Sequence, residues 1–191
     1  MKPLIRFSLS LVVAAVACAA DVVGDEPFHV MLPDEIMGDS SLLLGLGAVV
    51  EATGVSAVAL KQVPLADTSR YGIVDVVGPA RPVAGVEVVP FGAVVEKPAS
   101  NPPSDLAVIG RYSFTPDVYP DLAALAPASM GEIQLSDALT VQAQRRPLNG
   151  VLSTITRHDI GHPLGWLQAV VEAGLAHPDL GDEFGAWLRA R

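Results

Sequence analysis

The chain has 191 residues, of which half are hydrophobic but only 5% aromatic and 17% charged. A chain of this length and composition is expected to form one domain with an aliphatic core, so general disorder is excluded. Acidic residues outnumber basic ones by 21 to 12, for a net charge of −9, which leaves no basic surface for a nucleic acid. The single cysteine, Cys18, excludes a disulfide framework and a multi-cysteine zinc site.

The first twenty residues allow two interpretations. Lys2 and Arg6 precede an apolar run that ends in small residues, a pattern typical of a secretory signal. The same run also fits an apolar helix that packs inside a larger domain. Residues 7–20 are too few to cross a bilayer as a helix, so no stable membrane span is expected.

Beyond this segment, apolar runs and turn residues predict strands mixed with helices. Residues 28–32 predict a buried strand, and a helix capped by a serine at 40 or 41 runs to Thr53 and stops at Gly54. Further strands are predicted at 55–63, 73–77, 86–96, 106–114 and 151–155, a Gly/Pro-rich turn at 78–82, and helices at 117–125, 133–145 and 164–175. A final amphipathic segment, 184–188, carries Trp187 on its apolar side. The pattern indicates an α/β fold with a mixed, mostly parallel sheet and flanking helices.

Charged residues follow three of these strands at their carboxyl ends, where open α/β sheets bind ligands. They are Asp34-Glu35, Glu96-Lys97 and His158-Asp159. A carboxylate in such a place is a candidate Mg²⁺ ligand, since this ion prefers one or two carboxylates together with substrate phosphates; the alternative is a surface loop acid. Lys97, one of three lysines in the chain, either holds a phosphate as a point charge or pairs with Glu96.

Other candidate sites find less support in the sequence. His158, Asp159 and His162 offer ligands for zinc, iron or manganese, but the neighbouring glycine and proline keep the two histidines off one helical face. Glu132 opens a predicted helix, where its charge complements the helix dipole. The sequence has no G-x-S-x-G, Walker or G-x-G-x-x-G motif, so a nucleophilic hydrolase and a P-loop enzyme have no support.

Six short segments follow one another in the order seen in one known family. They are AVACAADVVGDEPFHVMLPDE (15–35), SRYGIVD (69–75), GAVVEKP (92–98), SDLAVIGRYSF (104–114), GEIQLSDAL (131–139) and RHDIGHPLGWLQAVVEAGL (157–175). With them the chain resembles the bacterial UTP–glucose-1-phosphate uridylyltransferases, or UDP-glucose pyrophosphorylases. The resemblance covers residue 15 to the C-terminus and implies a Rossmann-like nucleotidyltransferase fold, with a partial domain over residues 21–191. It also implies that residues 1–20 are the remnant of an internal helix, which favours a cytoplasmic chain over an exported one.

Two departures from the family pattern bear on activity. Members open with a strand, a Gly-rich nucleotide-binding loop and a basic segment for the triphosphate, and nothing like these occurs in the chain. We therefore expect an N-terminally truncated domain that keeps the sugar-phosphate and metal half of the site and is inactive in isolation. The strand at 28–32 would also lack one neighbour, so an open apolar edge and self-association are expected. The second departure is His162, where the family usually has asparagine.

The resemblance also implies a role for each matching residue. Asp34 and Asp159 resemble the two carboxylates at the family's Mg²⁺, and Asp34 is also expected to be catalytic. Glu96 resembles the residue that binds glucose hydroxyls, and Lys97 the catalytic residue that neutralises the sugar phosphate. Gly72 resembles a glycine that lets the hexose approach the backbone. The implied reaction converts UTP and glucose 1-phosphate to UDP-glucose and pyrophosphate; the alternative is a non-catalytic remnant that binds UDP-glucose or assembles with a partner.

Overall fold

The computed structural model describes residues 12–125 and 134–191 of the chain. Contacts between residues divide the chain into two compact units. Unit 1 comprises Met1–Met31 and Ser41–Thr154, and unit 2 comprises Leu32–Ser40 and Ile155–Arg191.

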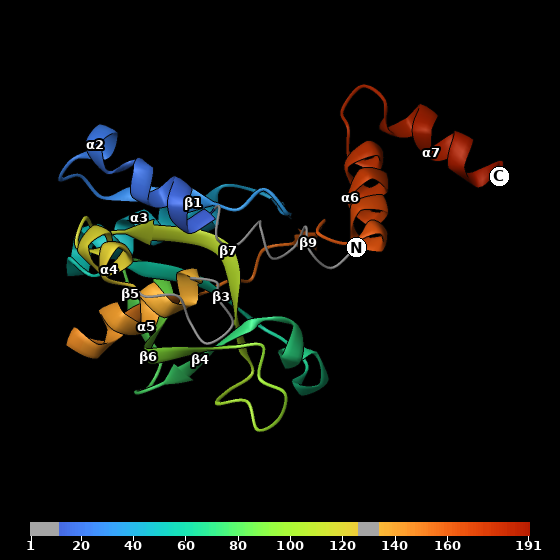
Figure 1. Cartoon of the computed structure of the whole chain (residues 1–191). Coiled ribbons are helices and arrows are strands. Elements are labelled where there is room, and N and C mark those ends of the chain that lie inside the picture. Colours follow the sequence, from blue (N-terminus) through green and yellow to red (C-terminus); the bar gives the residue numbers. More distant parts are fainter. Residues whose placement is uncertain (1–11, 126–133) are drawn as a thin grey trace. The chain divides into compact units, whose positions relative to one another are not determined.

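Unit 1 is built on a mixed sheet that has seven strands within the described residues. Their order is β1 (Phe28–Met31), β7 (Leu106–Phe114), β3 (Ala57–Gln62), β8 (Leu148–Leu152), β6 (Val86–Glu96) and β4 (Gly72–Val76), with β5 (Arg81–Val83) added to β6 (Figure 1). Ile73 of β4 also pairs with Ala107 of β7. The sheet is therefore strongly curved, so that β4, at one end of the strand order, also pairs with β7 near the other end.

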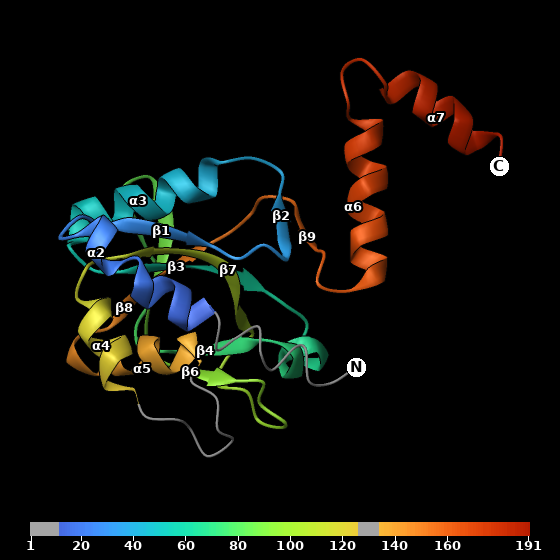
Figure 2. The same ribbon diagram turned by 45° about the horizontal axis from the view of Figure 1, so that its top comes forward.

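Helices cover both faces of this sheet. α3 (Ser41–Thr53) lies against β3, β7 and β8, and α5 (Leu135–Arg145) lies against β6 and beside α4 (Val118–Ala124). Figure 2 shows α3 and α5 on opposite sides of β3 and β7. The core between them is aliphatic with two phenylalanines, as the composition predicts, and includes Leu46, Val49, Val58, Leu60, Phe91, Ile109, Phe114 and Leu139.

The N-terminal part of the described chain is helical. Residues 12–18 form a helix in which Val13 and Val16 are buried, and the short helix α2 (Ala20–Val23) follows. Gly24 then takes a positive φ of 64° before β1 begins.

The sequence predicted the fold class correctly but not the strand directions. The α/β fold and the mixed sheet are confirmed, whereas the expectation of mostly parallel strands is wrong. Within the described residues only β3 and β8 pair in parallel, and all other pairings are antiparallel. The prediction rested on near-continuous apolar runs, which antiparallel strands also show where helices bury both faces. In addition, β5 turns directly into β6 through Ala84-Gly85, whose φ angles of 48° and 82° suit a two-residue hairpin.

Most predicted elements are present, some with shifted bounds. α3 ends at Gly54, which has a φ of 62° and donates its N–H to the Val50 carbonyl at 2.8 Å. β6 and β7 have the predicted bounds, whereas β8 begins three residues before the strand predicted at 151–155. The prediction missed the short elements α2, β2 (Glu35–Met37), β5, β9 (Arg157–Asp159) and the 3₁₀ helix η1 (Leu65–Arg70).

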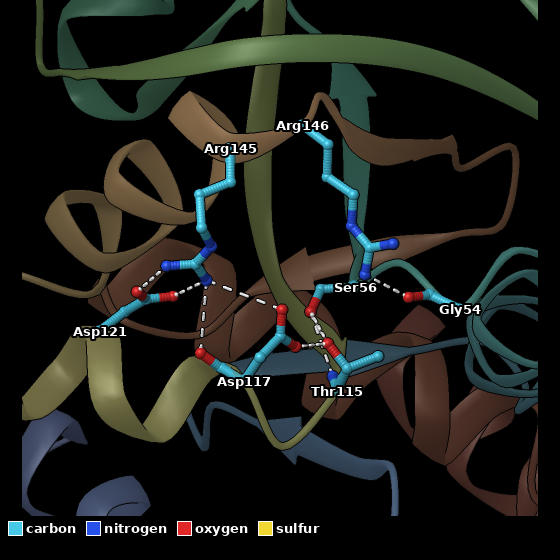
Figure 3. Close-up of polar contacts among 7 residues, drawn as sticks. All are labelled: Gly54, Ser56, Thr115, Asp117, Asp121, Arg145 and Arg146. Atoms are coloured by element: carbon cyan, nitrogen blue, oxygen red, sulfur yellow. Dashed lines mark hydrogen bonds and ion pairs between the residues drawn. The ribbon is translucent and has the colours of Figure 1, made fainter.

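An ionic cluster fastens α4 and α5 to the adjoining ends of β3 and β7 (Figure 3). The Arg145 guanidinium bonds both carboxylate oxygens of Asp121, with Nη2 donating to Oδ2 at 2.6 Å, and lies 3.6 Å from Asp117 Oδ2. Asp117 accepts a hydrogen bond from the Thr115 hydroxyl, which is 3.0 Å from Ser56 Oγ. Hydrogen bonding to Asp121, whose side chain is 5% exposed, raises the pKa of Arg145 above its ordinary value. We call this cluster the Arg145 clasp.

Unit 2 consists of a two-stranded antiparallel sheet followed by two helices. β2 pairs antiparallel with β9 (Arg157–Asp159), and α6 (Pro163–Leu175) and α7 (Gly181–Arg189) follow. Close packing at Gly174 joins the helices, because a Cβ there would lie 2.6 Å from Phe184 Cε1. No helix within residues 12–125 and 134–191 is long and apolar enough to cross a bilayer.

β1 lies at the end of the sheet order and, among the described residues, pairs only with β7. Its sequence, FHVM, holds no lysine or proline, and the Met31 side chain is 60% exposed. Because edges of this kind pair with other strands, we expect the purified chain to self-associate. Met31→Lys should shift the mass seen in sedimentation equilibrium towards the monomer, whereas Met31→Leu should not. A wild-type chain that stays monomeric at every concentration would contradict this expectation.

Candidate functional site

Three of the predicted site residues lie together in unit 1. Gly72 begins β4 and pairs with Glu96, the last residue of β6. A Cβ on Gly72 would lie 3.1 Å from Glu96 Oε2 and 3.0 Å from a methyl group of Val94. The absence of a side chain at Gly72 therefore leaves the Glu96 carboxylate accessible from that side. With Lys97 we call these residues the Gly72–Glu96–Lys97 cluster.

Lys97 takes an unusual backbone conformation in this cluster. Its φ is 45°, in the left-handed region that residues other than glycine rarely adopt, and its N–H donates to the Tyr71 carbonyl at 3.0 Å. Nζ lies 3.3 Å from Glu96 Oε1, so the lysine does pair with Glu96. The two side chains are 48% and 32% exposed, and an ion pair so exposed contributes about 0–1 kcal/mol. An anionic ligand can therefore draw Lys97 away from Glu96 at little cost.

The other two predicted residues lie together in unit 2. Asp34 precedes β2, and Asp159 ends β9 opposite Glu35. The Ile160 N–H donates to the Asp34 carbonyl at 2.8 Å, and the Gly161 N–H donates to Asp159 Oδ1 at 3.1 Å. A Cβ on Gly161 would lie 3.2 Å from Asp159 Oδ1 and 3.6 Å from Asp34 Oδ2, so both carboxylates border the same small volume. We call them the carboxylate pair.

The donor set of the carboxylate pair fits Mg²⁺. Within the described residues no group of three or more His, Cys, Asp or Glu side chains is arranged to hold a metal ion. A complete protein cage is not required for Mg²⁺, which keeps several waters and commonly binds through one or two carboxylates and substrate phosphates. Two carboxylates beside the backbone at Gly161 match that requirement.

The histidines of unit 2 have structural roles. His162 caps α6, with Nδ1 accepting a hydrogen bond from the Gly165 N–H at 3.1 Å. His158 Nε2 lies 3.3 Å from Glu172 Oε2 on α6. The alternative of a transition-metal site at His158, Asp159 and His162 is therefore wrong for the described residues.

Of the two acidic residues near the start of α5, Glu132 and Asp137, only Asp137 lies within the described residues. Asp137 Oδ2 accepts from the Gln134 N–H at 2.9 Å and completes a capping box at the start of α5. This contact gives Asp137 a structural role. Glu132 lies outside the described residues.

Residues 11–173 match the family model described as nucleotidyl transferase. The chain belongs to this family. Because the match includes most of both units, the two candidate clusters are parts of a nucleotidyl transferase chain.

Within this family, the chain is similar to one particular group of enzymes. The chain is 40% identical to the UTP–glucose-1-phosphate uridylyltransferase of Escherichia coli K12, over 91% of this chain and 59% of that protein. A UTP-bound UDP-glucose pyrophosphorylase of Acinetobacter baumannii matches with a TM-score of 0.78 and 31% identity, over 92% of this chain and 60% of that one. A UDP-glucose pyrophosphorylase complexed with UDP-glucose matches with a TM-score of 0.74 and 29% identity, over 94% and 62%. The resemblance seen in the six sequence segments is thus confirmed, although the chain spans only about three fifths of the length of these relatives.

One contact at the candidate site was not predicted from the sequence. Arg157 in β9 forms a two-bonded ion pair with Glu35 in β2, and both side chains are about nine-tenths buried. Both residues lie in the segments that carry the resemblance, but they are 122 positions apart and no spacing in the sequence links them. Only the pairing of β2 with β9 brings them together.

Proposed function

We propose that the chain carries out part of a UTP–glucose-1-phosphate uridylyltransferase reaction, with UTP and glucose 1-phosphate as substrates. The observation that carries this proposal is the 40% identity to the E. coli enzyme over 91% of the chain. The UTP and UDP-glucose named for two similar solved structures support the same substrates. A nucleoside triphosphate and a sugar phosphate also favour a cytoplasmic location.

In this proposal the Gly72–Glu96–Lys97 cluster binds the sugar phosphate. The Glu96 carboxylate accepts hydrogen bonds from glucose hydroxyls, and the space above Gly72 lets the ring approach the strand. Lys97 leaves its exposed pair with Glu96 and neutralises a phosphate oxygen. The cluster thereby orients the nucleophilic oxygen of glucose 1-phosphate.

The carboxylate pair of Asp34 and Asp159 holds Mg²⁺ in this proposal. The ion, when bound, withdraws charge from the phosphate oxygens of the nucleotide. An oxygen of glucose 1-phosphate forms a bond to the α-phosphorus of UTP, the bond from that phosphorus to the bridging oxygen breaks, and pyrophosphate leaves. This in-line displacement needs no covalent protein intermediate. The proposed residues therefore act by positioning the substrates and by neutralising phosphate charge.

The test measures UDP-glucose binding to the whole chain by calorimetry, with and without Mg²⁺. We expect Mg²⁺ to tighten binding, because a divalent ion held by Asp34 and Asp159 would offset the negative charge of the diphosphate. Asp34→Ala or Asp159→Ala should abolish the Mg²⁺ dependence. Equal affinity of the wild-type chain with and without the ion would remove the metal role of both residues.

Lys97→Ala provides the matched comparison. It should cost about 1.5–3 kcal/mol of binding free energy, on the scale of a charge-assisted hydrogen bond, and leave the Mg²⁺ dependence in place. Binding without formation of UDP-glucose from UTP and glucose 1-phosphate would favour the alternative of a non-catalytic UDP-glucose-binding chain.

A further inference from the structure

Arg157 forms a two-bonded ion pair within the two-stranded sheet of β2 and β9. Its Nε donates to Glu35 Oε2 and its Nη2 to Glu35 Oε1, each at 2.7 Å. The Arg157 and Glu35 side chains are only 10% and 8% exposed. Because Met37 is opposite Arg157 and Asp159 is opposite Glu35, the ion pair runs diagonally between the two strands. Two parallel bonds to a buried carboxylate fix the plane of the guanidinium.

The same guanidinium also lies near Asp159, one member of the carboxylate pair. Arg157 Nη2 lies 3.6 Å from Asp159 Oδ2, while Asp159 Oδ1 accepts the Gly161 N–H at 3.1 Å. The Asp159 carboxylate is therefore bordered by a backbone donor at one oxygen and a fixed cation at the other.

We propose that Arg157 is a positioning residue, which Glu35 anchors and which holds the Asp159 carboxylate in the orientation that binds a divalent cation. This inference rests on the proposed function, because it assigns a partner to a carboxylate proposed there as a Mg²⁺ ligand. It also gives the Glu35–Arg157 pair a role beyond joining two strands. Partners that orient metal-ligating carboxylates are commonly worth 10- to 100-fold in metal affinity.

Electrostatics and positioning predict changes of opposite sign. A cation so close to a metal ligand repels a divalent ion, so removal of its charge alone should tighten metal binding. If Arg157 positions Asp159, its replacement should weaken binding instead. Arg157→Lys separates the two effects, because lysine keeps the charge but cannot form the two-bonded fork with Glu35.

The experiment titrates the whole chain with Mn²⁺ alone and measures free Mn²⁺ by electron paramagnetic resonance. We expect Arg157→Lys to bind Mn²⁺ about tenfold or more weakly than the wild-type chain. The double variant Glu35→Met/Arg157→Met removes both charges and leaves no buried carboxylate unpaired. It should also bind weakly, because Asp159 has lost its orienting partner. Glu172→Gln, which removes the ion pair between His158 and α6 without touching Asp159, should bind like the wild-type chain.

The possible outcomes distinguish failure of this inference from failure of the proposed metal site. Wild-type affinity or tighter Mn²⁺ binding in Arg157→Lys, or restored affinity in the double variant, would show that the Glu35–Arg157 pair only holds β2 and β9 together. Either result overturns the inference and leaves the metal site standing. A wild-type chain that binds no Mn²⁺, or an Asp159→Ala variant that binds it equally well, overturns the proposed metal site and the inference with it.

Discussion

Gly165→Ala is expected to unfold unit 2 and to leave unit 1 folded. Gly165 lies in the first turn of α6, where its N–H bonds the capping His162. A Cβ there would overlap the carbonyl oxygen of Asp159 and lie 3.0 Å from its carbon. That carbonyl belongs to β9, which pairs with β2, so it cannot rotate away as a side chain could. α6 must therefore move away from the two-stranded sheet of β2 and β9.

The expected cost is large relative to the size of unit 2. Inserted atoms that displace backbone commonly cost about 1–3 kcal/mol, and a clash with a main-chain carbonyl belongs at the upper end or beyond. The substitution should otherwise favour a helix, because alanine is better than glycine there by about 1 kcal/mol. A loss of stability can therefore be assigned to the clash. Hydrogen exchange read by mass spectrometry should show lost protection over residues 155–191 and unchanged protection in β3, β7 and β8.

Gly174→Ala is the matched control in the same helix. The atoms that a Cβ would meet there belong to the ring of Phe184, which can turn aside. This variant should keep the protection of α6 close to that of the wild-type chain. If Gly165→Ala keeps full protection of residues 155–191, the backbone contact at Asp159 is less rigid than argued.

Where local chemistry determined an element, the sequence predicted it well. α3 was predicted to end at Gly54 because a glycine suits the left-handed residue after a helix, and the observed φ of 62° agrees. β6 and β7 were predicted with their observed bounds because long runs of valine, alanine and isoleucine end there at turn residues. These signals lie within the elements themselves.

Tertiary contacts explain the elements that were missed. β8 begins with Leu148-Asn149-Gly150, and the Asn-Gly step is typical of a turn. Asn149 is tolerated in the buried strand because its side-chain amide donates to Thr53 Oγ1 at 3.0 Å. Gly150 is needed because a side chain there would meet Leu60. Pro82 likewise indicated a turn, yet it lies in β5, which pairs on one side only with β6.

The candidate site was only partly accessible to sequence reasoning. Strand ends pointed to Asp34, Lys97 and Asp159 as charged candidates, but their roles came from the family resemblance. The pairing of Gly72 with Glu96, and of Glu35 with Arg157, depends on strand register between distant segments. A single sequence does not encode register in any spacing that can be read directly.

Arg145→Met is expected to destabilise unit 1 by about 1–3 kcal/mol, since it leaves the buried Asp121 carboxylate without its cation. Asp121 is 5% exposed at its side chain and bonds Arg145 through both oxygens. Methionine keeps most of the length of the arginine stem, so lost packing adds little. The measurement is the free energy of unfolding from urea titration, followed by the circular dichroism of the whole chain.

The neighbouring Arg146 supplies the matched control. Its guanidinium bonds only the Gly54 carbonyl among the contacts drawn in Figure 3, and this bond is exposed. Arg146→Met removes the same charge from the same end of α5 and should change stability by no more than about 0.5 kcal/mol. Net charge and helix-terminal effects are thereby equal in the two variants, and only the burial of the partner differs. The double variant Asp121→Asn/Arg145→Met should recover much of the loss, because a neutral amide costs less to bury than a carboxylate. Equal effects of Arg145→Met and Arg146→Met would mean that the Arg145 clasp contributes no more than a surface charge.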